Sequence, residues 1–167
     1  MPVPETPRPV LFVEDGENDV LLLKHAFAKV GSHIPLLVMG DGQAAWEYLV
    51  GSGSAEGPGR PSLIILDLKL PKKSGLEVLS SLRGHSELRR IPVLVMTSSM
   101  ERIDVDRAYN LGADFYLVKP TEPDRLLDLA QAIHAYWLAL HSDPDHQGAD
   151  PTLSRLRKMA EPGSPSR

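Results

Sequence analysis

The sequence predicts an α/β fold in which a parallel five-stranded sheet is covered by helices on both faces. Short apolar runs, rich in branched residues, alternate along the chain with longer segments whose apolar residues recur at helical spacing. An unbroken run of this kind is typical of a parallel strand that is buried on both faces. Because crossovers between parallel strands are right-handed, few topologies remain, and we expect the flavodoxin-like strand order 2-1-3-4-5 with five helices.

The strands are expected where the apolar runs fall. The clearest is Leu63-Ile64-Ile65-Leu66, which follows a loop rich in glycine and proline at residues 51–61 and stops at Asp67. The other strands are predicted at residues 10–13, 35–39, 91–96 and 114–118.

The helices are expected between these runs. Val20, Leu23, Phe27 and Val30 form an apolar stripe before the stop at Gly31, and Asp41 can cap a second helix. Ser74 with Glu77 and Ser98 with Glu101 have the spacing of capping boxes. Three helices are therefore predicted over about residues 74–83, 98–111 and 121–140.

A single domain is expected over residues 8–141. Residues 1–7 form a proline-rich, flexible lead-in, and residues 142–167 form either a frayed tail or an arm that docks on a partner. Leu153, Leu156 and Met159 would share one side of a short helix that starts near Pro151. Residues 142–167 are too few for a DNA-binding domain, so we expect no attached output domain.

Composition excludes several classes of function. The chain has no cysteine, so disulfides, thiolate metal sites and thiolate nucleophiles are impossible. A net charge of −4 gives no general attraction to nucleic acid or to an anionic membrane. No apolar run approaches the roughly 18 residues of a membrane span, and the N-terminus lacks a signal region. The protein is expected to be cytoplasmic.

Polar residues follow four of the predicted strands, and in a parallel sheet these strand ends lie on one edge. Carboxylates that converge there repel one another unless a cation intervenes. Hard oxygen ligands favour Mg²⁺, whereas an ammonium and a hydroxyl suit a phosphoryl group. A different interpretation is that each acid caps a helix and the lysine forms an ordinary salt bridge. The residues are Glu14 and Asp15, Asp67, Thr97 and Ser98, and Lys119.

These motifs resemble the receiver domain of two-component response regulators over about residues 8–141. The resemblance rests on Val13-Glu14-Asp15, Leu66-Asp67, Leu70–Gly75, Thr97-Ser98 and Lys119-Pro120. The details Glu14–Val20, Pro71–Leu76 and Tyr136-Trp137-Leu138 look like the single-domain regulators that partner bacterial phytochrome histidine kinases.

The resemblance implies a role for each residue. Asp67 would accept a phosphoryl group from a histidine kinase, and Mg²⁺ would be held by Glu14, Asp15, Asp67 and the backbone carbonyl of Lys69. The protein would be a signalling phosphoacceptor rather than an enzyme, although it would assist its own phosphorylation and dephosphorylation. Phosphate binding and switching would fall to Thr97, Ser98, Lys119 and Tyr116, with a cis bond between Lys119 and Pro120.

The family varies at the position of Lys69, where a long cation could bond the phosphate or hinder the attacking water. The resemblance therefore leaves the lifetime of the phosphorylated state open. Apolar residues outside the stripe of the last helix suggest self-association into a homodimer through the face formed by helix 4, strand 5 and helix 5. These interface candidates are Leu127, Tyr136 and Leu138.

Three functions other than a phosphoacceptor are compatible with the same fold. An FMN-binding flavodoxin would need a phosphate loop after the first strand, but acidic residues stand there. A Mg²⁺-dependent phosphatase would need a second acid two residues after Asp67, where Lys69 stands. A pseudo-receiver that acts as a scaffold by interaction alone is the remaining alternative.

Overall fold

The five expected strands form a parallel sheet. The computed structural model describes residues 7–53, 57–142 and 151–163, so most of the predicted lead-in lies outside the described residues. The strand order is β2-β1-β3-β4-β5, as predicted. The strands are β1 (Val10–Val13), β2 (Leu36–Met39), β3 (Leu63–Leu66), β4 (Val93–Thr97) and β5 (Phe115–Val118).

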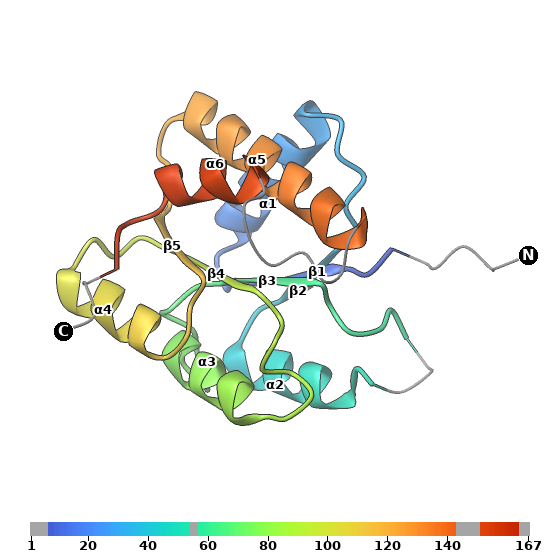
Figure 1. The fold of residues 1–167 in the computed structure, drawn as a ribbon, viewed down its shortest axis with the longest axis vertical. Coiled ribbons are helices and arrows are strands. Elements are labelled where there is room, and N and C mark those ends of the chain that lie inside the picture. The colour runs from blue at the N-terminus through green and yellow to red at the C-terminus, as the bar shows by residue number, and fades with distance from the viewer. Residues whose placement is uncertain (1–6, 54–56, 143–150, 164–167) are drawn as a thin grey trace, which may run out of the picture.

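Six helices, one more than expected, lie in the described part of the chain. Figure 1 shows α1, α5 and α6 on one face of the sheet and α2 and α3 on the other. The helices are α1 (Glu17–Lys29), α2 (Gly42–Gly51), α3 (Gly75–Gly84), α4 (Arg102–Asn110), α5 (Pro123–Ser142) and α6 (Pro151–Met159).

Alternate residues of each central strand feed two separate cores. Phe12 and Ile65 join the cluster beneath α1, α5 and α6, whereas Leu11 and Ile64 join the cluster against α2, α3 and α4. All residues of β1 and β3 are fully buried, which explains why their sequences are apolar throughout rather than alternating. These two strands are therefore a rigid base for whatever follows them in the chain.

One of the two predicted capping boxes is present. The Ser74 hydroxyl accepts from the Glu77 N–H, and the Glu77 carboxylate accepts from the Ser74 N–H. The prediction for Ser98 was wrong, because α4 begins later, at Arg102. The neighbouring Ser99 turns inward instead, where its hydroxyl accepts from the Glu101 N–H and donates to Asp104.

The C-terminal helix α6 docks on its own chain. Leu156 is fully buried in the cluster shared with α1 and α5, and Leu153 and Met159 pack against the same cluster. On the flank of the contact, the Arg155 guanidinium donates to the Gln131 side chain of α5. The sequence left open an arm that docks on a partner. In the described residues, α6 covers its own chain instead.

The segment after α6 runs beside β5, the edge strand of the sheet. The Glu161 N–H donates to the Tyr116 carbonyl at 2.8 Å. Tyr109 of α4 bridges the two segments, because its hydroxyl donates to the Glu161 carbonyl and accepts from the Tyr116 N–H. Arg102 also donates to the Pro162 carbonyl. The arm thus contacts α4, β5 and α5 together.

The expected interface residues do not form one exposed face. Tyr136 is buried, and its ring packs edge-on against Phe115 at 5.9 Å between centroids. Leu127 is partly buried against the core, and only Leu138 is exposed. Tyr136 therefore packs inside the chain, in the same cluster that α6 joins. It is not part of a surplus apolar surface on α5.

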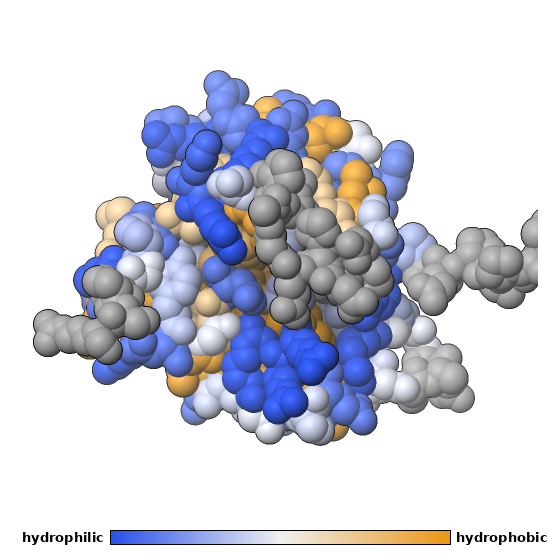
Figure 2. Space-filling view, viewed as in Figure 1, coloured by the Kyte–Doolittle hydropathy of each residue, from blue (hydrophilic) through white to orange (hydrophobic). Residues whose placement is uncertain are grey.

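The described surface gives no sign of a membrane-spanning element. None of the helices in the described ranges combines the length and apolar character that a membrane crossing requires. On the face shown in Figure 2, hydrophilic residues predominate and hydrophobic ones occupy small separate areas.

Replacing Leu156 with aspartate should undock α6, because it places a charge in a fully buried apolar site. Hydrogen exchange at the Glu161 amide, which bonds to Tyr116, should then accelerate by about tenfold or more. Ser154→Asp adds the same charge at an exposed position of α6 and should leave the exchange rate unchanged. Equal exchange in both variants would contradict the docked arrangement.

Candidate functional site

The polar strand ends are brought to one edge of the sheet by continued backbone pairing. The Glu14 N–H donates to the Met39 carbonyl, and the Asp67 N–H donates to the Val13 carbonyl. At the same edge, where β4 and β5 end, the Lys119 N–H donates to the Thr97 carbonyl at 2.8 Å. Each residue is thus fixed in register one step beyond its strand.

Three carboxylates meet at this edge. Glu14, Asp15 and Asp67 each offer an oxygen, and these oxygens all lie within 4.8 Å of one another. Glu14 and Asp67 are buried, whereas Asp15 is exposed. The predicted convergence of these acids is therefore present.

The Lys119 ammonium lies among acids from three elements. Its Nζ is 2.7 Å from Glu14 Oε2, 2.9 Å from Asp67 Oδ2 and 2.9 Å from Asp19 Oδ2. Asp19, in the first turn of α1, was missed in the sequence. The available signal was a carboxylate at the start of the helix that follows the Glu14-Asp15 pair.

The surroundings shift the pKa of two groups at this edge, Glu14 and Lys119. Burial raises the pKa of Glu14, and the Asp67 charge adds to this, outweighing the lowering effects of Lys119 and the Gly16 N–H. Burial alone would lower the pKa of Lys119, but its contacts with Glu14, Asp19 and Asp67 outweigh burial and raise it. Lys119 is therefore held as a cation beside Glu14, whose charged form burial disfavours.

Thr97 is buried without a partner for its hydroxyl. The residue is fully buried, and its Oγ1 has no hydrogen-bond partner. Ser98, the next residue, is exposed. A buried hydroxyl without a partner lowers stability. In this arrangement the Thr97 hydroxyl is free both to donate and to accept a hydrogen bond.

Tyr116 already points inward. It is fully buried, its hydroxyl donates to the Ser99 carbonyl at 2.9 Å, and burial raises its pKa.

Two further expectations concern the residues around the acceptor. The Lys69 side chain is exposed, and its N–H lies 3.4 Å from Asp67 Oδ1, at the long limit of a hydrogen bond. The expected cis bond between Lys119 and Pro120 is absent, because no peptide bond among the described residues is cis. The trans form is the more stable isomer of an X–Pro bond.

Helix α3 packs directly on the backbone of the acceptor. The Gly75 N–H donates to the Leu68 carbonyl at 2.9 Å. A Cβ added to Gly75 would lie 2.1 Å from the Asp67 carbonyl oxygen, so only glycine fits there. This close approach fixes the turn that carries Asp67.

The donor set fits a hard divalent cation. Carboxylate oxygens are the ligands that Mg²⁺ prefers, and the chain offers three of them within reach of one ion. The Lys119 ammonium faces two buried carboxylates and the half-exposed Asp19. The local excess of negative charge favours a further cation.

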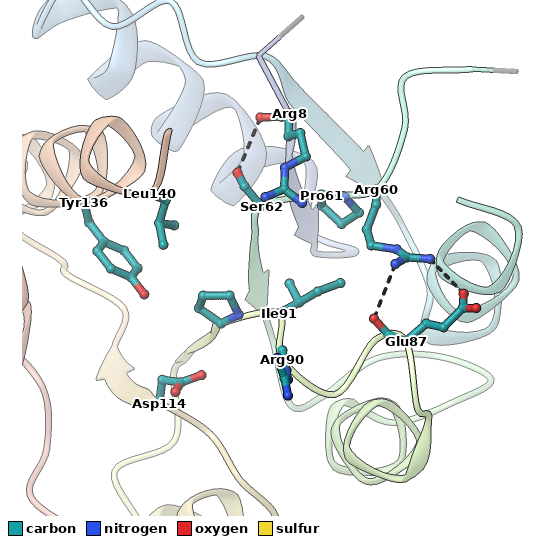
Figure 3. Close-up of a pocket in the computed structure, with 11 residues that line it drawn as sticks. Arg8, Arg60, Pro61, Ser62, Glu87, Arg90, Ile91, Asp114, Tyr136 and Leu140 are labelled. Atoms are coloured by element: carbon teal, nitrogen blue, oxygen red, sulfur yellow. Dashed lines mark hydrogen bonds and ion pairs between the residues drawn. The ribbon is translucent and has the colours of Figure 1, made fainter. Parts of the chain in front are cut away.

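The cavity in Figure 3 lies at the opposite edge of the sheet. It has a volume of about 460 Å³, and Tyr136 and Leu140 of α5 face Arg8 and Ser62 across it. Its charged groups include Arg60, which is paired with Glu87, and Asp114, which accepts from the Val93 N–H. It shares no residue with the acid cluster, so it has no part in that site.

An acid cluster, a lysine and a buried threonine lie together on the carboxyl edge of this sheet. The family model for the response regulator receiver domain matches residues 10–131. The chain belongs to this family of two-component systems, whose members are signalling domains.

Several relatives are regulators of similar length. Response regulator Rcp1 of Synechocystis is 38% identical over 132 residues, which cover 79% of this chain and 90% of Rcp1. The Mn²⁺-bound structure of Rcp1 has a TM-score of 0.70 and covers 79% of this chain and 95% of that one.

Two further similar structures are of phytochrome response regulators. The phosphorylated cyanobacterial phytochrome response regulator RcpA is 33% identical, with a TM-score of 0.72, and covers 80% of this chain and 96% of its own. The bacteriophytochrome response regulator AtBRR is 39% identical, with a TM-score of 0.63, and covers 78% and 94% respectively.

Replacing Thr97 with valine should raise the free energy of unfolding by about 1 kcal/mol, because it removes an unpartnered buried hydroxyl and keeps the shape. Urea denaturation of the metal-free protein measures this. Thr97→Ser keeps the hydroxyl but loses a buried methyl, so it should lower the stability by about 1 kcal/mol. A valine variant less stable than wild type would mean that the hydroxyl has a partner.

Proposed function

We propose that this protein is a stand-alone response regulator in which Asp67 accepts a phosphoryl group from a histidine kinase. The observation that carries the proposal is the placement of Asp67, buried beside the Glu14-Asp15 pair with Lys119 Nζ 2.9 Å from its Oδ2. A carboxylate in this position can act as a nucleophile, with an ammonium ready to meet the charge of the incoming group.

The residues around Asp67 suit each part of the transfer. An Asp67 oxygen attacks the phosphorus, the bond from phosphorus to the kinase histidine breaks, and the histidine nitrogen keeps the electron pair and takes a proton from water. Lys119 stays beside the new acyl phosphate and neutralises part of its charge. The Thr97 hydroxyl, which has no partner, is free to donate to a phosphoryl oxygen.

Mg²⁺ would be held by Glu14, Asp15 and Asp67, together with the Lys69 backbone carbonyl. When bound, it would neutralise charge on the acids and on the phosphoryl oxygens. The Mn²⁺-bound form of the relative Rcp1 supports a divalent cation as the cofactor.

A phytochrome-type histidine kinase is the proposed partner. Support comes from similarity to RcpA, a phytochrome response regulator, and to AtBRR, a bacteriophytochrome response regulator.

Thr97, Ser98 and Tyr116 form the proposed switch, because they occupy β4, its end and the neighbouring β5. Lys69 would set the lifetime of the phosphorylated state, since its exposed side chain stands two residues from the acceptor. The site as a whole would assist both its own phosphorylation and its dephosphorylation.

A scaffold that works without phosphorylation is the alternative. It is disfavoured because no member of the site is missing, and because a buried acid cluster with too few cations costs stability without serving an interface.

Phosphotransfer from a phytochrome-type kinase with Mg²⁺ should label wild type and leave Asp67→Asn unlabelled, because the amide is not a nucleophile for phosphorus. Radiolabel retained on the chain measures this. Asp114→Asn, at the opposite edge of the sheet, is the control and should be labelled normally. Label retained by Asp67→Asn would refute the acceptor, and loss of label in EDTA would support the metal.

Self-association through the face of α4, β5 and α5 is the proposed consequence of phosphorylation. The face is covered by α6 and the segment after it, so a second copy needs α6 to move. Leu156 is the buried anchor of that contact.

Light scattering should therefore show more dimer for Leu156→Asp than for Ser154→Asp, and a further rise with a phosphoryl mimic. Undocking of α6 exposes the apolar cluster that Leu156 covers, and burial of this surface in a second copy would compensate. Monomers in every variant, at high concentration and with the mimic, would end the proposal of a homodimer.

A further inference from the structure

The Lys119 ammonium has three hydrogens and three carboxylate neighbours, one of which lies outside the proposed metal set. Glu14 and Asp67 belong to the acid cluster that can hold a cation, whereas Asp19 does not. The Asp19 side chain is 42% exposed, against 2% for Glu14 and 7% for Asp67. Asp19 thus reaches the lysine from the rim of the site.

The local backbone is shaped so that Asp19 can reach inward. A Cβ added to Gly16 would lie 3.1 Å from Asp19 Oδ2 and 3.2 Å from Glu14 Oε1. The two carboxylates therefore flank the bare Cα of Gly16 on their way to Lys119. The Val20 N–H, which donates to the Gly16 carbonyl, ties this turn to the start of α1.

We propose that Asp19 is a positioning residue, which retains the Lys119 ammonium when Glu14 and Asp67 engage the metal and the phosphoryl group. This inference rests on the proposed phosphoacceptor function and deepens it. Carboxylates that share a divalent cation attract an ammonium less strongly, because part of their charge is already met. Asp19, which stands apart from the cluster, keeps its full charge for Lys119.

Retention by Asp19 leaves the remaining Lys119 hydrogens for the phosphoryl oxygens. The geometry allows this, since Lys119 Nζ contacts Asp19 and Asp67 at the same distance of 2.9 Å. A proton donor that is already in place costs no reorganisation when the anion arrives. Asp19 would therefore favour an anion at Asp67 although it is itself an anion.

The direction of the change in mimic binding distinguishes positioning of Lys119 from a simple contribution of negative charge by Asp19. If Asp19 contributed only its negative charge, Asp19→Asn would weaken repulsion and tighten the binding of an anionic phosphoryl mimic. If Asp19 positions Lys119, the same substitution loosens the binding. The two roles therefore predict changes in opposite directions.

The test is the dissociation constant of beryllofluoride, measured by calorimetry on the full chain at saturating Mg²⁺. Wild type should bind the mimic, and Asp19→Asn should bind it about fivefold more weakly. Glu17→Gln is the matched control, since Glu17 is an exposed acid in the same first turn of α1. It should bind as tightly as wild type, or more tightly.

Each outcome decides one of the two proposals. If Asp19→Asn binds beryllofluoride as well as wild type or better, Asp19 does not position Lys119. Equal weakening in Asp19→Asn and Glu17→Gln would also overturn the role, because it would show an effect of charge at the helix start. If wild type itself fails to bind the mimic, the phosphoacceptor function fails instead.

Discussion

The ion contacts of Lys119 are the interaction on which the site depends. Glu14 and Asp67 are buried carboxylates from adjacent strands, and without the ammonium their charges would be uncompensated. Lys119 follows β5, which is separated from β3 by β4. Neighbouring strands are about 4.8 Å apart, so a long side chain has to span this gap. The strand between them, β4, ends in the small and fully buried residue Thr97.

The rest of the fold stabilises this arrangement of charges. Two apolar cores, one on each face of the sheet, bury β1 and β3 completely and hold the acid-bearing turns in register. The contact of Gly75 with the Asp67 backbone removes another freedom of the acceptor. The site can therefore keep an excess of negative charge that would destabilise a looser structure. That excess is also what makes this edge a candidate site for a divalent cation.

The sequence predicted the strand order, the converging acids and the Ser74–Glu77 capping box, because each depends on local pattern or on topology. It failed where the direction of a side chain or the identity of a partner decides. Asp19 reaches Lys119 past the bare Cα of Gly16, a direction that residue types alone do not reveal. The apolar stripe of α6 was visible, but periodicity cannot distinguish a partner from the chain's own α5. The position of Ser99, one residue after the expected cap, is likewise a matter of backbone path.

The site and the arm are not independent, because they share β5. Lys119 extends the carboxyl end of this four-residue strand, and the Tyr116 carbonyl within it accepts from the Glu161 N–H after α6. The Tyr116 N–H donates to the Tyr109 hydroxyl, so the strand is held from α4 as well. Coupling between two sites is reciprocal in free energy. If a change at Lys119 shifts β5 and so weakens the docking of α6, the docked α6 opposes that change with the same free energy.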